Sequence, residues 1–291
     1  MILKQYSYEL VNVFTFNGKS GNGLAVFDQP TDLETSQMQE VAKRIGLSET
    51  VFMVQEKQGA DYAIRIFTPE KELPFAGHPT IGSLFTLLHT GFLKKKKSYI
   101  QQVHDRFIPL KLSDDGFISM DQGQPDFGES IEPEMAASLL TLKESDIAAV
   151  PVAVSTGVPY LIVPLASVDA LKRAKLDIGV NRETARITGA EGVLPYVVYK
   201  DGLKCRMFGP LMGVPEDPAT GSAAGPLACY VVQNGIMQPE NVSTVQIDIL
   251  QGVGKSGPSM LRAVVRGGVE KVLRVEVGGY CRYVGQRSIK V

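Results

Sequence analysis

The alternation of hydrophobic and polar positions divides the chain into short strands and a few helices. The first run, MILKQYSYELVNVFTFNG, alternates apolar and polar residues, so it predicts a strand rather than a secretory signal. Apolar side chains spaced about 3.6 residues apart predict two helices, one near 79–90 (Ile81, Leu84, Phe85, Leu88) and one near 223–234 (Leu227, Tyr230, Val231). Each of these two helices is expected to begin just after a glycine and to end at one.

The predicted elements occur twice in the same order. The first half contains a strand at 23–29, a helix at 35–46, strands at 50–56 and 62–69, and the helix near 79–90. The second half contains a strand at 159–165, helical segments at 168–174 and 181–189, strands at 194–200 and 203–210, and the helix near 223–234. The remaining runs alternate and are broken by Gly or Pro, which is typical of antiparallel strands; they are 118–125, 245–250, 260–268 and 271–285.

This pattern predicts an α+β fold of two pseudo-symmetric domains. Each domain is expected to be a twisted, mostly antiparallel sheet or barrel wrapped around a central helix, not a doubly wound parallel sheet. A chain of 291 residues is long for one core and natural for two. We expect one domain over 1–118 together with 277–291 and the other over 119–276.

Short motifs repeat within this larger repeat. RIFTP (65–69) returns as RMFGP (206–210), 141 residues later, and ELPFAGHP (72–79) returns as EDPATGSA (216–223), 144 residues later. The difference predicts a three-residue insertion in the second copy, between strand and octet. Further upstream, SGNGLAVF (20–27) matches STGVPYLIV (155–163) at an offset near 136.

The composition restricts the function classes. A net charge of −1 and 44% apolar residues describe an ordinary globular protein, with no sign of a nucleic-acid or membrane partner. Three cysteines, Cys205, Cys229 and Cys281, fit neither a zinc site nor a disulfide framework, so a reducing cytoplasm is expected. No GxGxxG opening a helix after a strand, GxxxxGK[ST], HExxH or GxSxG motif occurs, and no metal or cofactor is expected.

The repeated octets precede the two predicted helices. Backbone N–H groups at a helix N-terminus bind anions, and a glycine there lets a ligand approach closely. Two such ends would form one anion pocket if the halves pack about a pseudo-two-fold axis. The alternative is plain capping and turn formation, for which glycine, proline, serine and aspartate are also used. The paired occurrence at Gly77 and Gly221 favours the anion site.

The two copies differ at their polar positions. His78 follows the first glycine, Ser222 follows the second, and Asp217 stands in the second octet where the first has Leu73. Glu49, between a predicted helix and the strand TVFMV, is a further candidate base. Each has a structural alternative, since the histidine and the aspartate are good cap and turn residues and a glutamate at such a junction usually faces solvent.

With these motifs, the sequence resembles the PhzF-like phenazine-biosynthesis isomerase family. The resemblance rests on VNVFTFNGKSGNGLAVF, GLSETVFM, RIFTPEKELPFAGHPTIG, STGVPYLIV, RMFGPLMGVPEDPATGSA and QGVGKSGPS. It implies a two-domain fold similar to diaminopimelate epimerase, a site between the halves and, in many members, a homodimer. That epimerase has a cysteine base at each helix end, whereas this chain has Gly77–His78 and Gly221–Ser222, so a two-cysteine mechanism is not expected.

The resemblance also implies a reaction. The family's type enzyme isomerises trans-2,3-dihydro-3-hydroxyanthranilate without metal or organic cofactor, and a glutamate carries the proton between ring carbons. The matching residues are Glu49, His78 and Asp217, and the backbone around Gly77, Gly221 and Ser222 would hold the substrate carboxylate. The chain departs from the pattern at Lys255, Ser256 and Gly257, where an arginine is frequent, and in GNGLAV, where many relatives have Gly-Asn-Pro; both departures affect the expected substrate.

Three functions follow as hypotheses. The first is a cofactor-free isomerase that transfers a proton on a small carboxylate-bearing, possibly dihydroaromatic, substrate. The second is an amino-acid or hydroxy-acid epimerase or racemase, for which His78 and Asp217 are the available pair of opposed bases. The third is a non-catalytic carboxylate-binding or interaction module.

Overall fold

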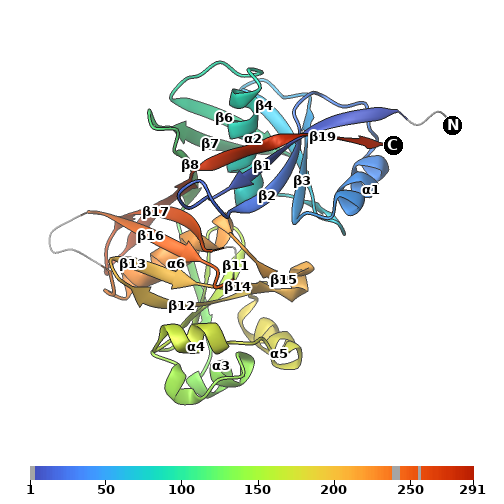
Figure 1. Ribbon diagram of the computed structural model, residues 1–291. Helices are drawn as coiled ribbons and strands as arrows, with labels where there is room; N and C mark the ends of the chain where they lie inside the picture. The colour runs from blue at the N-terminus through green and yellow to red at the C-terminus, as the bar shows by residue number, and fades with distance from the viewer. Residues whose placement is uncertain (1–3, 238–242, 255–256) are drawn as a thin grey trace. The chain divides into compact units, whose positions relative to one another are not determined.

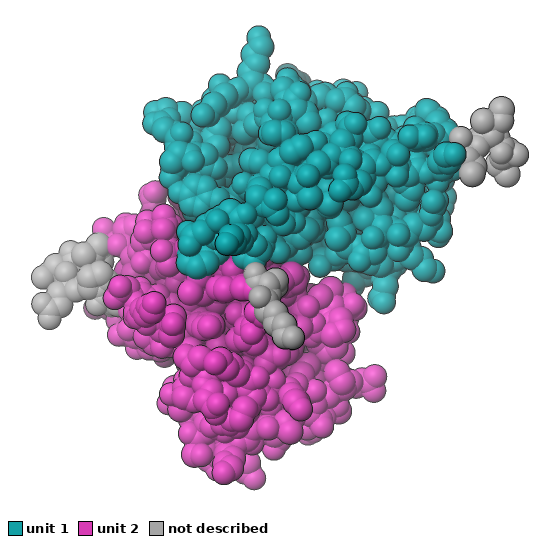
Figure 2. Space-filling model, in the orientation of Figure 1, with its two compact units in different colours: residues 1–121, 278–291 teal, residues 122–277 magenta. Residues whose placement is uncertain are grey.

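The computed structural model describes residues 4–237, 243–254 and 257–291 and divides into two compact units. Unit 1 comprises Met1–Asp121 and Gly278–Val291, and unit 2 comprises Gln122–Val277 (Figure 2). The limits expected from the sequence, 1–118 with 277–291 and 119–276, remain a prediction about independently folding domains.

Unit 1 consists of a mixed sheet with two helices (Figure 1). Its elements are β1 (Gln5–Val13), β2 (Asn22–Phe27), α1 (Thr35–Ile45), β3 (Glu49–Val54), β4 (Tyr62–Phe67), β5 (Glu72–Leu73), α2 (Gly77–His89), β6 (Ser98–Val103), β7 (Arg106–Leu112), β8 (Ile118–Gly123) and β19 (Cys281–Lys290). The main sheet runs in the order β19, β1, β2, β3, β4, β6, β7, β8. Only the β2/β3 and β4/β6 neighbours in this order are parallel.

Unit 2 follows the same plan with additional helices. Its elements are β9 (Asp126–Ser130), α3 (Pro133–Leu139), η1 (Glu144–Asp146), β10 (Val152–Ser155), β11 (Pro159–Pro164), α4 (Val168–Arg173), α5 (Ile178–Thr188), β12 (Gly192–Tyr199), β13 (Gly202–Cys205), β14 (Met207–Gly209), η2 (Pro210–Met212), β15 (Val214–Asp217), α6 (Gly221–Gln233), β16 (Thr244–Gln251), β17 (Ser259–Gly267) and β18 (Val272–Gly279). The β11/β12 and β13/β16 neighbours are parallel, and the other described neighbours in this sheet are antiparallel.

The repeat seen in the sequence is therefore a repeat of topology. In unit 1, β2 crosses over through α1 to the parallel strand β3, and β4 crosses over through α2 to β6. In unit 2, β11 crosses over through α4 and α5 to β12, and β13 crosses over through α6 to β16. Parallel neighbours require such crossovers, so the two parallel pairs in each unit fix where the helices lie.

The helices α2 and α6 are the most buried helices of their units. Each is 13 residues long, and nearly all of its side chains are buried. The helix α2 packs on β1, β2, β3 and β19, and α6 packs on β10, β11, β16 and β17. The opposite face of each sheet is covered by the other helices. In unit 1, Phe27 stacks on Phe52, which meets Phe67 edge to face, beneath α1.

Glycine allows α2 to approach its sheet closely. A Cβ atom on Gly82 would lie 2.5 Å from Cδ2 of Leu24 and 2.6 Å from Cγ2 of Val13, inside van der Waals contact. This close packing holds the first turn of α2, which carries His78, against the strands that precede Glu49.

Some boundaries differ from those expected. Both helices begin at the repeated glycine rather than after it, because Ala76 and Thr220 are the last extended residues and serve as N-caps. The strand expected at 203–210 breaks at Arg206, whose neighbour across the ladder is Pro195. Proline has no N–H to return the hydrogen bond that its carbonyl accepts from Arg206, so the ladder is interrupted. Among the helices of the described residues, none reaches the length and hydropathy that a membrane span requires.

Candidate functional site

Glu49 is the first residue of β3 and faces α2. The helix α1 ends at Gly46, which adopts a left-handed φ of 70° and donates its N–H to the carbonyl of Ala42. The chain then turns into β3, where Glu49 lies beside Leu24 of the parallel strand β2. The glutamate therefore occupies the edge of the buried layer beneath α2, and its side chain is only 17% exposed.

His78 lies beside this carboxylate. Its Nδ1 is 2.8 Å from Oε2 of Glu49, and its side chain is 3% exposed. Oε2 of Glu49 is buried and makes no hydrogen bond of ordinary geometry within the described residues, so the approach is an ion-pair distance rather than a formed hydrogen bond. Unit 1 thus brings together two of the three residues predicted to act on protons.

The N-terminal turn of α2 lacks a side-chain cap. Its N-cap residue, Ala76, has no side chain that accepts a hydrogen bond from the first N–H groups. The hydroxyl of Thr80 donates to the carbonyl of Ala76, which fixes the turn from below. Gly77 has no Cβ to obstruct an anion at this end of the helix.

Unit 2 fills the corresponding space differently. The register of β11 with β12 places Tyr160 beside Gly192, as the register of β2 with β3 places Leu24 beside Glu49. Gly192 has no side chain, and the Tyr160 ring lies over it, 3.0 Å from the point where its Cβ would be. The Tyr160 hydroxyl is 2.8 Å from Oγ of Ser222, the counterpart of His78. The second copy therefore has a neutral hydroxyl pair where the first has Glu49 and His78.

Asp217 lies in a separate hydrogen-bonded cluster at the start of α6. Oγ1 of Thr220 donates to Oδ2 of Asp217 at 2.5 Å. Gln251 of β16 accepts from the backbone N–H of Thr220 at 2.9 Å and donates to the backbone carbonyl of Asp217 at 2.8 Å. All three side chains belong to residues less than one tenth exposed. Sequence reasoning singled out Asp217 and missed the other two.

The repeated arginine and glutamate form a bidentate salt bridge, here called a fork, in each unit. In unit 1, Arg65 donates to both carboxylate oxygens of Glu72, at 2.8 and 2.6 Å. In unit 2, Arg206 makes the same fork with Glu216, at 2.7 and 2.8 Å. Hydrogen bonding within the first fork raises the pKa of Arg65 and lowers the pKa of Glu72. These recurring residues fasten the segment before each central helix to its sheet.

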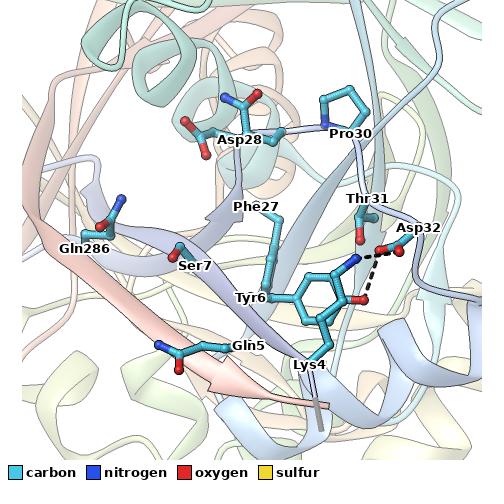
Figure 3. A pocket seen from close by; sticks show the side chains of 11 residues that line it. Lys4, Gln5, Tyr6, Ser7, Phe27, Asp28, Pro30, Thr31, Asp32 and Gln286 are labelled. Atoms are coloured by element: carbon cyan, nitrogen blue, oxygen red, sulfur yellow. Dashed lines mark hydrogen bonds and ion pairs between the residues drawn. The ribbon is translucent and has the colours of Figure 1, made fainter. Parts of the chain in front are cut away.

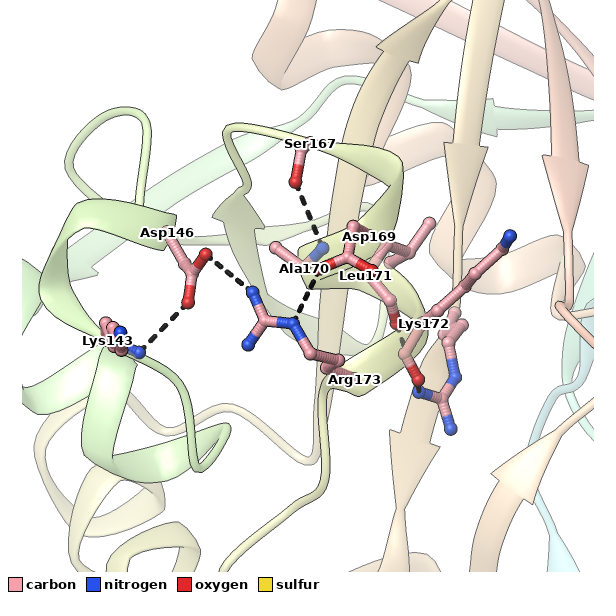
Figure 4. A network of polar contacts seen from close by, with 9 residues as sticks. Lys143, Asp146, Ser167, Asp169, Ala170, Leu171, Lys172 and Arg173 are labelled. Atoms are coloured by element: carbon pink, nitrogen blue, oxygen red, sulfur yellow. Dashed lines mark hydrogen bonds and ion pairs between the residues drawn. The ribbon is translucent and has the colours of Figure 1, made fainter.

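The second fork is also tied to α4. Nη1 of Arg206 donates to the backbone carbonyls of Leu171, at 3.1 Å, and Ala174, at 2.7 Å, which lack partners within the helix. Arg173 of the same helix bonds Asp146 and Asp169 (Figure 4). The recurring arginine of unit 2 therefore has a structural task, which accounts for its place in the repeat.

The described residues contain no group of three or more His, Cys, Asp or Glu side chains arranged to hold a metal ion. The three thiols are poor nucleophiles, because burial raises the pKa of Cys205, Cys229 and Cys281, to about 12 for Cys229. None of them is at the N-terminal turn of α2 or α6.

A surface cavity of about 410 Å³ lies on unit 1, between the start of β1 and the segment after β2 (Figure 3). On its wall, Lys4 and the Tyr6 hydroxyl both donate to Asp32, at 2.6 and 2.9 Å. These polar groups are already paired with one another, and none of the residues predicted for the site lines the cavity.

The two departures from the family pattern have different outcomes. Lys255 and Ser256 lie outside the described residues. In GNGLAV, Gly21 has a φ of 91°, and a Cβ there would lie 2.7 Å from the carbonyl oxygen of Val13, so the turn before β2 requires glycine. Gly23 is paired with Asn12 on β1.

Comparison with known proteins assigns the family. The model of the phenazine biosynthesis-like protein family (PhzC-PhzF) matches residues 11–287. A trans-2,3-dihydro-3-hydroxyanthranilate isomerase of Pseudomonas fluorescens is 34% identical over 282 residues, covering 94% of this chain and 95% of that protein. A PhzF-family protein of Bacillus anthracis superposes with a TM-score of 0.87 at 25% identity, covering 99% of this chain and 100% of that one.

More distant structures agree in fold. A hydroxyproline epimerase of Agrobacterium vitis superposes with a TM-score of 0.67 at 12% identity, over 99% of this chain and 93% of its own. The predicted α+β, epimerase-like fold is thereby confirmed. The chain belongs to the phenazine biosynthesis-like (PhzF) family, and it is a PhzF-like isomerase.

Proposed function

We propose that this isomerase moves a proton between two carbons of a small, unsaturated, carboxylate-bearing substrate, with Glu49 as the proton carrier and no metal or organic cofactor. The relatives named as trans-2,3-dihydro-3-hydroxyanthranilate isomerases support a cyclic carboxylate of this kind. The ionised carboxylate removes a proton from one carbon, the double bond shifts, and the same carboxyl returns the proton to a second carbon. The substrate is isomerised and the enzyme is regenerated.

The observation that carries the proposal is the buried Oε2 atom of Glu49, 2.8 Å from Nδ1 of His78. An imidazole nitrogen can donate to an ionised carboxylate or accept from a protonated one, depending on its own protonation. His78 is therefore suited to support Glu49 in both states of a proton shuttle. The backbone N–H groups at Gly77, Gly221 and Ser222 keep their predicted role of binding the substrate carboxylate.

A racemase, the second hypothesis, needs two bases that act on opposite faces of one carbon. At the position matching Glu49, unit 2 has Gly192 covered by Tyr160, and at the position matching His78 it has Ser222. Neutral hydroxyl groups of serine and tyrosine are weak bases. The remaining candidate, Asp217, accepts a hydrogen bond from Thr220, which stabilises its ionised form and makes it a weaker base. These features favour one carrier over two opposed bases.

The third hypothesis, a non-catalytic binding module, is set aside because the chain is an isomerase. The homodimer and the cytoplasmic location inferred from the sequence remain predictions. For the dimer, sedimentation of the purified chain is the direct measurement.

The test follows the substrate by proton NMR in deuterated water. The purified chain is incubated with a panel of small unsaturated cyclic carboxylates that includes trans-2,3-dihydro-3-hydroxyanthranilate. Wild type is expected to form product, with solvent label at a carbon-bound position to the extent that the carrier exchanges. Glu49→Gln is expected to lower kcat/KM by a factor of about 10² to 10⁴. Glu56→Gln is the matched control, because Glu56 follows β3 and is exposed.

Full activity of Glu49→Gln on a substrate that wild type converts would contradict the role of Glu49. Label entering both hands of a racemised product would favour the racemase instead. In deuterated water, a proton that the substrate itself supplied and that reappears at the new carbon, in any proportion, supports a single carrier.

A further inference from the structure

The cluster around Asp217 consists of three polar residues whose counterparts in unit 1 are all apolar. The octet repeat, at an offset of 144, matches Asp217 with Leu73 and Thr220 with Ala76. The counterpart of Gln251 is Val103, and this match comes from strand register. Cys205 is paired with Gln251 on parallel strands in unit 2, and Ile64 is paired with Val103 in the same way in unit 1. Cys205 and Ile64 are related by the offset of 141. The substituted positions in unit 2 are thus in mutual contact.

Backbone groups fix the orientation of the Gln251 amide. Its oxygen faces the Thr220 N–H, which can only donate, and its nitrogen faces the Asp217 carbonyl, which can only accept. A flipped amide would put donor against donor and acceptor against acceptor, in a site where Gln251 is 2% exposed. The observed orientation is therefore the one that the surrounding backbone requires.

This orientation determines the direction of the next hydrogen bond. Nε2 of Gln251 also donates to Oγ1 of Thr220 at 2.9 Å, so it uses an acceptor position of that hydroxyl. The hydroxyl proton is then directed to its other neighbour, Oδ2 of Asp217, at 2.5 Å. A carboxylate that receives such a hydrogen bond is stabilised in its ionised form, and one of its two oxygens is held in place.

We infer that Gln251 and Thr220 are positioning residues that hold Asp217 as an oriented anion for the isomerase reaction. The inference rests on the proposed function together with the sequence prediction that Asp217 is one of the catalytic residues of that site. The relay from amide to hydroxyl to carboxylate does not depend on that role.

Two ionisable residues next to this cluster, Glu216 and Cys205, do not compete with the relay for Asp217. Glu216, its neighbour in the chain, is paired with Arg206, which precedes Met207, the residue opposite Asp217 on β14. Cys205, opposite Gln251 on β13, has a pKa raised by burial and stays a neutral thiol. From α6, the polar group facing Asp217 is the Thr220 hydroxyl at its N-cap. Comparing Thr220→Val with Thr220→Ser therefore isolates the contribution of the Thr220 hydroxyl to the titration of Asp217.

The test is a ¹³C NMR titration of the aspartate carboxyl groups in the full chain, with the Asp217 signal assigned by its loss in Asp217→Asn. Thr220→Val keeps the side-chain shape and removes the hydroxyl, and it is expected to raise the titration midpoint of Asp217 by about one pH unit or more. Thr220→Ser keeps the hydroxyl and is expected to restore the wild-type midpoint. Gln251→Met leaves the hydroxyl undirected and is expected to give a smaller rise.

Thr188→Val is the matched control, because Thr188 is also a buried threonine of unit 2 whose hydroxyl is hydrogen-bonded. A merely structural role would not move the midpoint, and a midpoint in Thr220→Val within about 0.2 unit of wild type would overturn the inference. If Thr220→Val does not fold, Gln251→Met decides instead, and a midpoint within about 0.2 unit of wild type in that variant would overturn the inference. Full activity of Asp217→Asn would instead contradict the proposed role of Asp217, whatever the midpoints show.

Discussion

Replacing Gly82 with alanine adds one methyl group where α2 meets its sheet. The new Cβ would lie 2.5 Å from Cδ2 of Leu24 and 2.6 Å from Cγ2 of Val13, two side chains with no exposed surface. Overpacking of this kind costs about 1–3 kcal/mol, whereas alanine gains about 0.8–1.0 kcal/mol over glycine in a helix interior. We expect a net loss of about 1 kcal/mol in the free energy of unfolding of unit 1.

A double-mutant cycle separates this clash from other effects. Val13→Ala alone removes two methyl groups and is expected to cost about 1–3 kcal/mol. In the double variant the contact with Val13 is relieved while the contact with Leu24 remains, so the two losses should not add, and the pair should be more stable than their sum by about 1 kcal/mol.

Urea unfolding followed by circular dichroism measures these energies, since the chain has no tryptophan for fluorescence. Gly179→Ala in α5 is the control, because its Cβ would contact only the side chain of Asp177, at 3.2 Å, and it should change stability by less than about 0.5 kcal/mol. If the two losses at positions 13 and 82 add to within about 0.3–0.5 kcal/mol, the close packing of α2 on β1 is refuted.

Three further outcomes follow. The arginine partner lowers the pKa of Glu72 in the folded chain. Its stabilising effect is therefore present above the pKa of Glu72 in the unfolded chain and is lost as pH falls through its pKa in the folded chain. The difference in free energy of unfolding between wild type and Glu72→Gln should shrink from pH 7 to pH 3.5 in urea titrations. Cys205 and Cys229 should resist a thiol reagent at pH 8 until the chain is unfolded, so at most one thiol per native chain reacts. Tyr160→Phe should lower kcat/KM less than tenfold in the isomerase assay, and a loss as large as that of Glu49→Gln would contradict a single carrier.

The order of elements was predictable because apolar periodicity and repeated motifs are local properties of the sequence. The start of α6 was harder to predict. Proline is tolerated best in the first turn of a helix, so Pro226 favours a start near 223, but the helix begins at Gly221 and Pro226 lies inside it. The break at Arg206 depends on Pro195, a residue on another strand, and the matching position in unit 1 is Phe52, which has an N–H. Such effects require the register between strands.

Some residues of the candidate site were likewise predictable from the sequence, and others were not. His78 and Asp217 were found because they are polar residues at positions where the two octets differ. Thr220 is in that octet too, but its role becomes visible only with Gln251, which is 31 residues away and is matched to Val103 by strand pairing alone. Pairing information of this kind is absent from a single sequence, since register is set by contacts between distant strands.

The duplicated motif shows which residues each half has to keep and which it can change. The arginine–glutamate forks recur because each fastens the segment before a central helix, and losing one partner would leave a partly buried charge uncompensated. The positions that face the helix ends carry no such constraint, and there the halves differ: Glu49 and His78 in unit 1 correspond to Gly192 and Ser222 in unit 2. A proton carried by one group needs only one carboxylate of this kind, so we expect an exchange of these roles to fail. Gly192→Glu would have to displace the Tyr160 ring, and it should cost stability without restoring the activity of Glu49→Gln.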